Sequence, residues 1–435
     1  MISRAVPGGD AARLRLYGWR QAPVVGVALL ALAAGFGQFG AVAALGSVAK
    51  TFGHITSGAS FTDQAGLSGT VLGVGLAILR LASLAALPLA GLADRFGRRA
   101  TLLTTCALGL SFTIAAAFSP SYWWFVAIFA CGRPLLSATA AVAQVEAAEL
   151  TPSAQRARAV ALVAAGYGVG AGLTAVIHSL GGSALGFRGV FALAIVPLAF
   201  LPFIGALIVE PDRYRTMPSA EHRRPVIGPV TPPYRRRLVV VALLAFCVSV
   251  MTGPANSLVF IYAQNVRHLP GALTAAMVVG AGVSGLAGLL LGQHLADRLG
   301  RRPTVAVAMM AMAGFGILTY SGSRVSLVAG YVLGVLAGAV FAPAGGALSN
   351  ELFPTAVRAS VAGWNVAAGV LGAVVGLLVF GAVADVSGVG NHTLLAAAVT
   401  FVPMVPATAL LLALPETRGR EPEDLWPTVP GPATG

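Results

Sequence analysis

Charged residues are scarce in this sequence. They make up 10% of the 435 residues, against about 25% in an average soluble domain, while hydrophobic residues make up 57%. A water-soluble protein of this size would need more charged residues on its surface and fewer hydrophobic residues. The composition therefore argues against a cytosolic enzyme, and it excludes a disordered chain for the same reason.

Cysteine is scarce as well. Cys106, Cys131 and Cys247 lie singly within apolar runs and form no CxxC pair. This spacing predicts neither a zinc site nor a disulfide framework, and we interpret all three as small core residues. The apolar runs also hold no Ser/His/Asp or metal-binding constellation. We expect no catalysis, no metal and no cofactor, with the proton-motive force as the candidate energy source.

Acidic residues are outnumbered, because Asp and Glu total 15 against 28 Lys and Arg, a net charge of +13. The basic residues recur in short bursts between apolar runs rather than in one stripe with interleaved aromatics. This pattern favours a membrane surface over nucleic acid. We expect the bilayer and a small-molecule substrate as partners, no nucleic acid, and a monomer. The excess of Arg over Lys, with abundant Ala, Val and Gly, indicates a bacterial inner membrane protein.

Long apolar runs dominate the sequence. A membrane-spanning helix needs about 20 apolar residues, and twelve runs approach or exceed this length. They predict an all-α polytopic membrane protein. The expected spans are 24–47, 67–89, 101–119, 122–146, 157–180, 189–209, 238–262, 271–293, 304–321, 325–348, 358–382 and 393–414.

Basic residues set the expected topology. With the N-terminus inside, segments predicted to be cytoplasmic carry 22 of the 28, external loops carry four, and two lie within spans. A missed span would invert every later loop, so this bias predicts that both termini are cytoplasmic. The polar stretch 210–237 divides the chain into two six-helix bundles, 24–209 and 238–414, with cytoplasmic tails at 1–23 and 415–435.

Two motifs recur between the halves. The segment GLADRFGRR, which begins at Gly91, returns as LADRLGRR, which ends at Arg302, so that Asp94 corresponds to Asp297, 203 residues later. The pattern E-x-x-P-x-x-x-R occurs at 149–156 and again at 351–358, 202 residues later. Two motifs at nearly one offset predict a duplication, which is a recurrent plan of transporters.

The repeated loops resemble the signature loop of the major facilitator superfamily. The two E-x-x-P-x-x-x-R patterns, and PETRG at 415–419, resemble those of its sugar and metabolite porter branches. The resemblance extends from about residue 24 to 420. It implies two bundles of six helices, a small polar or anionic metabolite as substrate, and alternating access as the mechanism.

The resemblance also implies a cytoplasmic gate at these loops. We expect Asp94 to dock near the start of the eleventh span and Asp297 near the start of the fifth, where helix N-termini carry partial positive charge. The loop arginines would pair with Glu149 and Glu351. Alternatively, these charges only set the topology. The candidate gate residues are Gly91, Asp94, Arg95, Gly97, Arg98, Arg99, Glu149, Arg156, Asp297, Arg298, Gly300, Arg301, Arg302, Glu351 and Arg358.

Two arginines lie deep in the predicted spans. An arginine near the bilayer centre costs about 2.5–3.5 kcal/mol even on a lenient scale, so Arg80 and Arg133 are candidates for function. No acidic residue lies as deep in the sequence, and this leaves a positive cavity that favours an anionic substrate. Alternatively, Arg133 forms a structural bridge with Glu146 or with backbone carbonyls.

Four uncharged residues complete the expected substrate site. Gln38 occupies the first span, where metabolite porters often place an acid. Asn256 and Tyr262 resemble the G-x-N-x-x-x-Y element of sugar porters with one extra residue, and Asn365 follows a tryptophan in the eleventh span. Interhelical hydrogen bonds or an interfacial aromatic position are the alternatives.

Proton coupling needs another acid, because Gln38 carries no proton. The candidates are Glu146, Asp63, Asp385 and His178. A multidrug or natural-product efflux antiporter is the alternative function. A membrane sensor is less consistent with the sequence, since no appended soluble domain is visible.

Overall fold

The computed structural model describes residues 15–58, 60–212, 232–386 and 392–419. Most of the expected linker and tails, 1–14, 213–231 and 420–435, therefore lies outside the described residues. The described chain is helical and contains twelve helices long and apolar enough to cross a membrane. The predicted fold class, an all-α polytopic membrane protein, is confirmed.

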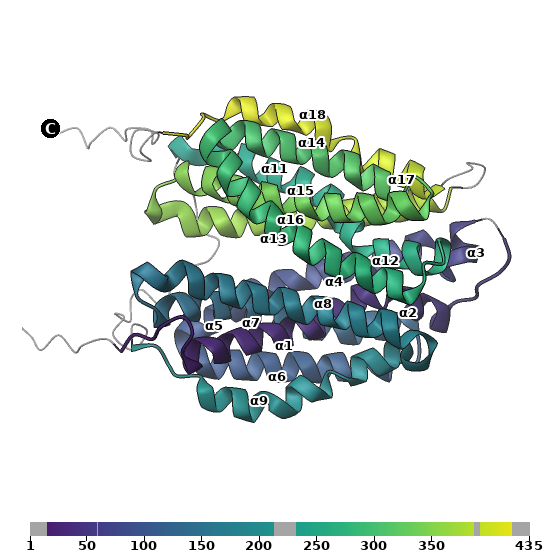
Figure 1. Ribbon diagram of the computed structural model, residues 1–435, viewed down its shortest axis with the longest axis horizontal. Helices are drawn as coiled ribbons and strands as arrows, with labels where there is room; N and C mark the ends of the chain where they lie inside the picture. Colours follow the sequence, from purple (N-terminus) through teal and green to yellow (C-terminus); the bar gives the residue numbers. More distant parts are fainter. Residues whose placement is uncertain (1–14, 59, 213–231, 387–391, 420–435) are drawn as a thin grey trace, which may run out of the picture.

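The first half of the chain forms the N bundle (Figure 1). Its second span is not one helix, because a 3₁₀ turn at Ser83–Ala85 separates α4 from α5. The helices are α1 (Ala22–Ala43), α2 (Leu45–Phe52), α3 (Phe61–Ala65), α4 (Gly69–Ala82), α5 (Ala86–Phe96), α6 (Arg98–Ala117), α7 (Tyr122–Leu150), α8 (Ser153–Ala192) and α9 (Ile195–Leu207).

The second half forms the C bundle, which lies beside the first (Figure 1). Its first span contains Pro254 inside α11, is interrupted after Ser257 and ends in a π-helical turn. The helices are α11 (Pro232–Ser257), α12 (Val259–Ile261), η3 (Tyr262–Val266), α13 (Gly271–Leu299), α14 (Arg301–Thr319), α15 (Arg324–Glu351), α16 (Thr355–Ala384), α17 (His392–Phe401), α18 (Met404–Ala407) and η4 (Thr408–Ala413).

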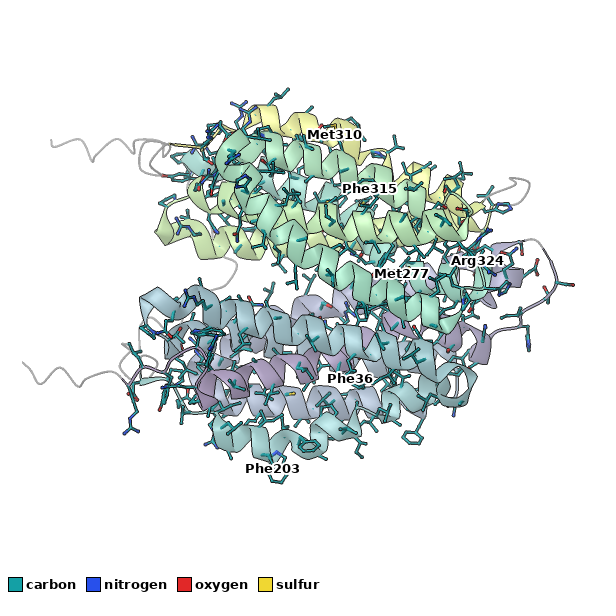
Figure 2. The ribbon with its side chains drawn as sticks, viewed as in Figure 1. Phe36, Phe203, Met277, Met310, Phe315 and Arg324 are labelled. Atoms are coloured by element: carbon teal, nitrogen blue, oxygen red, sulfur yellow. The ribbon has the colours of Figure 1, made fainter. Side chains whose placement is uncertain are left out.

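The outer surface of the helices is apolar. Phe203 on α9 and Met310 on α14 are 71% and 43% exposed and point away from the bundles (Figure 2). A soluble protein rarely exposes contiguous apolar surface on this scale, whereas lipid is its natural surrounding. Met277 on α13, by contrast, is buried.

The bundles meet at one end. We call the end that carries Arg15 and Gly419 the tail end, and the end that carries Asp63 and Asp385 the distal end; they lie at the left and right of Figure 1. Contacts between α4 and α16 and between α8 and α13 join the bundles, and the residues that touch lie at mid-depth and toward the distal end. Gly69, for example, packs on the backbone of Gly381.

Candidate functional site

Two arginines of the N bundle lie near each other at mid-depth. Arg80 is on the last turn of α4, and Arg133 is on α7 and only 7% exposed. The two guanidinium groups are close enough to repel one another, and both interact electrostatically with Tyr167 on α8. In the described residues neither has a carboxylate partner. This arrangement concentrates positive charge where the bundles face each other.

The 3₁₀ turn after α4 positions Arg133. Arg133 Nε donates a 2.9 Å hydrogen bond to Ser83 Oγ, within the turn. The sequence alternative that Arg133 pairs with Glu146 is wrong, because neither carboxyl oxygen of Glu146 has a hydrogen-bond partner among the described residues. Arg80 reaches across to the C bundle, where its guanidinium lies 3.5 Å from Ser257 Oγ.

Gln38 links three helices of the N bundle. Its amide nitrogen donates to Ser137 Oγ on α7, and its amide oxygen accepts from Tyr167, both at 2.7 Å. The side chain is only 9% exposed. Gln38 therefore holds Tyr167 beside the arginines, while its own polar groups are already bonded. Nothing in the sequence around Tyr167, a stretch of small residues, indicated this role.

The remaining predicted substrate residues lie in three different places. Asn256 is exposed on α11 and lines a cavity. Tyr262 is 2% exposed and packs on Tyr320 with ring centroids 4.9 Å apart, inside the C bundle. Asn365 on α16 donates to Ser349 on α15 at 3.2 Å. Of these three, only Asn256 lies near Arg80, because Arg80 contacts the next residue, Ser257.

The loops at the tail end contain two matching sets of contacts. Arg98 bonds Glu149 at 3.0 and 3.2 Å, and Arg301 bonds Glu351 at 3.3 Å. These are two of the pairings expected from the sequence. Gly97 and Gly300 precede the arginines with φ of 96° and 111°, a backbone conformation that favours glycine.

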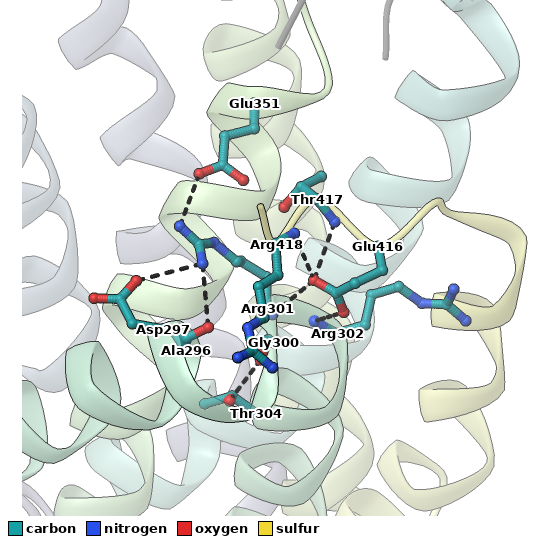
Figure 3. Close-up of polar contacts among 10 residues, drawn as sticks. All are labelled: Ala296, Asp297, Gly300, Arg301, Arg302, Thr304, Glu351, Glu416, Thr417 and Arg418. Carbon is teal, nitrogen blue, oxygen red and sulfur yellow. Dashed lines mark hydrogen bonds and ion pairs between the residues drawn. The ribbon is translucent and has the colours of Figure 1, made fainter. Parts of the chain in front are cut away.

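Two further carboxylates cap the helices that follow these glycines, and the sequence did not predict this role. Glu210 accepts from the backbone N–H groups of Arg98 and Arg99 at 2.6 and 3.1 Å. Glu416 accepts from those of Arg301 and Arg302 at 2.9 and 3.0 Å (Figure 3). Both belong to the Glu-Pro and Pro-Glu motifs that end the bundles, but only the fold shows which helix each one meets.

The pKa of Glu416 is shifted by this capping. Partial burial opposes its ionisation, but backbone N–H groups of Arg301, Arg418, Arg302 and Thr417 outweigh the burial and lower the pKa below its usual value. A carboxylate at a helix N-terminus also complements the helix dipole. Glu416 is therefore a stable anion at neutral pH.

The other candidate gate residues lie differently. The side chain of Arg99 donates to the carbonyl of Gly205, so its expected pairing with a glutamate is wrong. The side chain of Asp297, near the end of α13, is 73% exposed and pairs with Arg301 at the start of α14, so in this structure it does not dock at α8 as expected (Figure 3). Asp94 has a side chain outside the described part of the chain. The rest lie on or near the loop surface: Gly91, Arg95, Arg298, Arg302, Arg156, which donates to Ala148, and Arg358, which donates to Phe353.

The distal end is closed by polar contacts between the bundles. Asp385, at the end of α16, accepts from the backbone N–H groups of Gly69 and Thr70 at 2.6 and 2.8 Å and so caps α4 of the other bundle. Asn265 is 1% exposed and donates to carbonyls of Gly46 and Ala65, both at 3.0 Å. The sequence predicted no role for Asn265.

Two further proton-coupling candidates lie at the same end. His178 on α8 lies 2.6 Å from Ser47 Oγ and 3.4 Å from Gln264 of the C bundle. Asp63 forms a capping box with Ser60 at the start of α3. Hydrogen bonds from Ser60 and then Thr56 lower the pKa of Asp63, so this exposed group is ionised near neutral pH.

Glu146 differs from every other acid in the described chain that was a candidate for coupling. It lies on α7 one turn before Glu149 and is 0% exposed. Its charge interacts with Glu210, Glu149 and Arg98 of the loop, although it bonds none of them. The group is thus buried beside a cluster of charges whose arrangement affects it.

Comparisons with known proteins agree with this architecture. The chain is 26% identical over 346 residues to a protein of Cupriavidus pinatubonensis named as a probable 4-methylmuconolactone transporter, covering 75% of this chain and 77% of that one. The fold is similar to the E. coli xylose transporter in an inward-open conformation, with a TM-score of 0.71, 18% identity and coverage of 93% and 100%. It is also similar to a nucleoside transporter, with a TM-score of 0.69, 13% identity and coverage of 90% and 99%.

A family model supplies the assignment. The model of the Major Facilitator Superfamily matches residues 27–294 and 281–432, which together span nearly the whole chain. Twelve membrane-spanning helices, two bundles and the repeated charged loops are the structural counterpart of this match. The chain belongs to the major facilitator superfamily of membrane transporters.

Proposed function

We propose that this transporter carries a small organic anion across the bacterial inner membrane by alternating access. The observation that supports this most is the pair Arg80 and Arg133, which lie at mid-depth and lack a carboxylate partner among the described residues. Burying a charged side chain in a membrane protein is costly, so such a residue is a candidate for function. An anion between the bundles would offset part of this positive charge.

The structure corresponds to one state of that cycle. We assign the tail end to the cytoplasm because of its basic loops, so the distal contacts of Asp385 and Asn265 close the external side. Rocking of the bundles would break these contacts and bring the two tail-end loops together. In that second state Asp297 would reach the start of α8, and the loops would act as the cytoplasmic gate.

The charge of the site disfavours the alternative of drug efflux. Lipophilic cations would be repelled by Arg80 and Arg133, because like charges near each other in a low dielectric are strongly unfavourable. The name of the Cupriavidus relative, which concerns a metabolite rather than a drug, points the same way.

We assign proton coupling to Glu146. Asp63 and Asp385 already accept hydrogen bonds from backbone N–H groups at helix starts, whereas Glu146 is buried without a partner among the described residues. Movement of the segments that contain Arg98 and Glu149 would change the charges around it, so the loss of a proton can follow the state of the gate. His178 is the second candidate, since it lies where the bundles part.

A thermal-shift screen of the purified protein tests the proposal. Carboxylates, neutral sugars and lipophilic cations would be compared at equal concentrations, because a ligand at 100 times its Kd adds about 2.7 kcal/mol to stability. We expect stabilisation by carboxylates that disappears in Arg80→Gln. Stabilisation by lipophilic cations alone would contradict the proposal and favour drug efflux.

A further inference from the structure

The C bundle contains a cavity next to the charged centre. Its volume is about 220 Å³, and it lies between α11, α14 and α15. An apolar cavity of about 150 Å³ is large enough to hold benzene. The size therefore suits one six-membered ring with a small substituent. The lining is mostly apolar and includes Met251, Met312, Gly334 and Gly338, and its polar side chains are Thr252, Asn256, Thr319, Tyr320 and Tyr331.

The lining carries no charge in the described residues, and the Tyr320 hydroxyl there is buried without a hydrogen-bond partner among them. Thr319 already donates to the carbonyl of Phe315 at 2.9 Å. Because most of the lining is apolar, a polyol bound there would find fewer hydrogen-bonding partners than in water, and each unpaired buried polar group is unfavourable. Methionine and tyrosine side chains instead offer polarisable surface for a ring.

The rim of this cavity lies next to the Arg80 contact along α11. Asn256 lines it and is exposed, and the next residue, Ser257, is the one that Arg80 approaches to 3.5 Å. Aromatic contacts continue the wall toward the N bundle, since Tyr331 packs on Phe260 and Phe260 packs on Phe39, with centroids 6.1 and 5.9 Å apart. A carboxylate at Arg80 and a ring in the cavity would thus belong to one small molecule.

We propose that the transported anion is a ring carboxylate, bound with its carboxylate at Arg80 and its apolar ring in the cavity of the C bundle. This inference rests on the proposed function, because it takes the anion at Arg80 to be the substrate. It divides recognition between the bundles, so that the N bundle selects charge and the C bundle selects shape. Sugar acids, which share the carboxylate but lack the apolar ring, would bind more weakly.

Gly334 offers a way to fill the cavity without disturbing the fold. A Cβ atom added at Gly334 would meet nothing closer than 3.9 Å, and one at Gly338 nothing closer than 3.8 Å. Gly334→Leu therefore places a side chain in the space proposed for the ring. Gly314→Leu is the matched control, since Gly314 is exposed on α14, has nothing within 4 Å of an added Cβ and does not line the cavity.

The experiment measures binding of benzoate, gluconate and tetraphenylphosphonium to the full-length purified protein. We expect benzoate to bind more tightly than gluconate. Gly334→Leu should weaken benzoate binding about tenfold or more through steric overlap, while gluconate binding and the Gly314→Leu protein stay unchanged. Arg80→Gln should weaken both anions. Gly338→Val repeats the test if Gly334→Leu does not fold.

The outcomes distinguish failure of the ring carboxylate inference from failure of the proposed anion transport. If gluconate binds as tightly as benzoate, or if filling the cavity leaves benzoate affinity unchanged, the ring carboxylate inference is wrong and the anion proposal stands. If neither anion binds and tetraphenylphosphonium does, the proposed function itself fails.

Discussion

The two bundles have the same charged contacts in their loops and different side chains in their interiors. In the loops, Arg98 pairs with Glu149 as Arg301 pairs with Glu351. In the interiors, the offsets of 203 and 202 residues that relate the loops match Arg80 to Val283, Arg133 to Val335 and Glu146 to Leu348.

The similar loops and the different interiors indicate which structural features both halves need and which only one half needs. Both halves need a loop that turns tightly and holds the next helix, so the same chemistry serves twice. A substrate that is bound between the halves has two unlike ends, and each interior then needs to recognise only one of them. The largest asymmetry is electrostatic, because Arg80, Arg133 and Glu146 all belong to the N bundle.

The comparison of the loops predicts the largest effect on the free energy of unfolding. Arg98 is the more buried arginine, with 8% of its side chain exposed against 18% for Arg301. Breaking a buried ion pair costs about 3–5 kcal/mol, so Arg98→Gln should lower the melting temperature strongly. Arg301→Gln should cost about 1–3 kcal/mol. Equal losses in the two variants would show that the loops contribute alike to stability.

The comparison of the interiors predicts a smaller effect on binding. Arg80→Val makes the N bundle resemble the C bundle at this position and removes a charge-assisted contact of about 1.5–3 kcal/mol. Anion affinity measured by thermal shift should fall about 10-fold to 150-fold. Arg158→Gln removes the same charge from an exposed position and should leave the affinity unchanged. A similar loss in both variants would mean that only the net charge matters.

Glu146→Leu tests the third difference, because it copies Leu348. An unpaired buried polar group costs about 1–3 kcal/mol, so the melting temperature should stay unchanged or rise by a corresponding amount. Transport in proteoliposomes should lose its dependence on a pH gradient if Glu146 carries the proton. A clearly less stable variant would indicate that the carboxyl makes a stabilising contact. Glu146→Gln provides the matched polar control.

Removing a helix cap is expected to have the smallest effect on the free energy of unfolding. The pKa of Glu416 is lower in the folded protein than its usual value of 4.5, so its contribution to stability is present above pH 4.5 and is lost as the pH falls through the folded pKa. Glu416→Gln should cost about 1 kcal/mol at neutral pH. The difference in melting temperature from the unmodified protein should shrink below pH 4.5. Glu210→Gln should give a similar loss at neutral pH, and a pH-independent difference for Glu416→Gln would exclude this capping role.

Sequence patterns predicted the local structure of the loops better than the contacts between residues that are far apart in the chain. The glycines of the two loops and the pairs Arg98–Glu149 and Arg301–Glu351 could be predicted because the motif repeats at a fixed offset. The caps at Glu210 and Glu416 could not, because each carboxylate meets a helix more than a hundred residues away in the chain. The burial of Tyr262 could not be predicted either, since it depends on how the turn Tyr262–Val266 packs inside the C bundle.

The sequence by itself determined the membrane-spanning helices, the two halves and the depth of Arg80 and Arg133, because length, hydropathy and repeats are properties of the chain. Only the tertiary structure decided which side chains meet. It placed Ser83 beside Arg133, Asp385 on α4 of the other bundle, and the apolar cavity beside Arg80. These contacts join distant segments, and their distances depend on how whole helices pack.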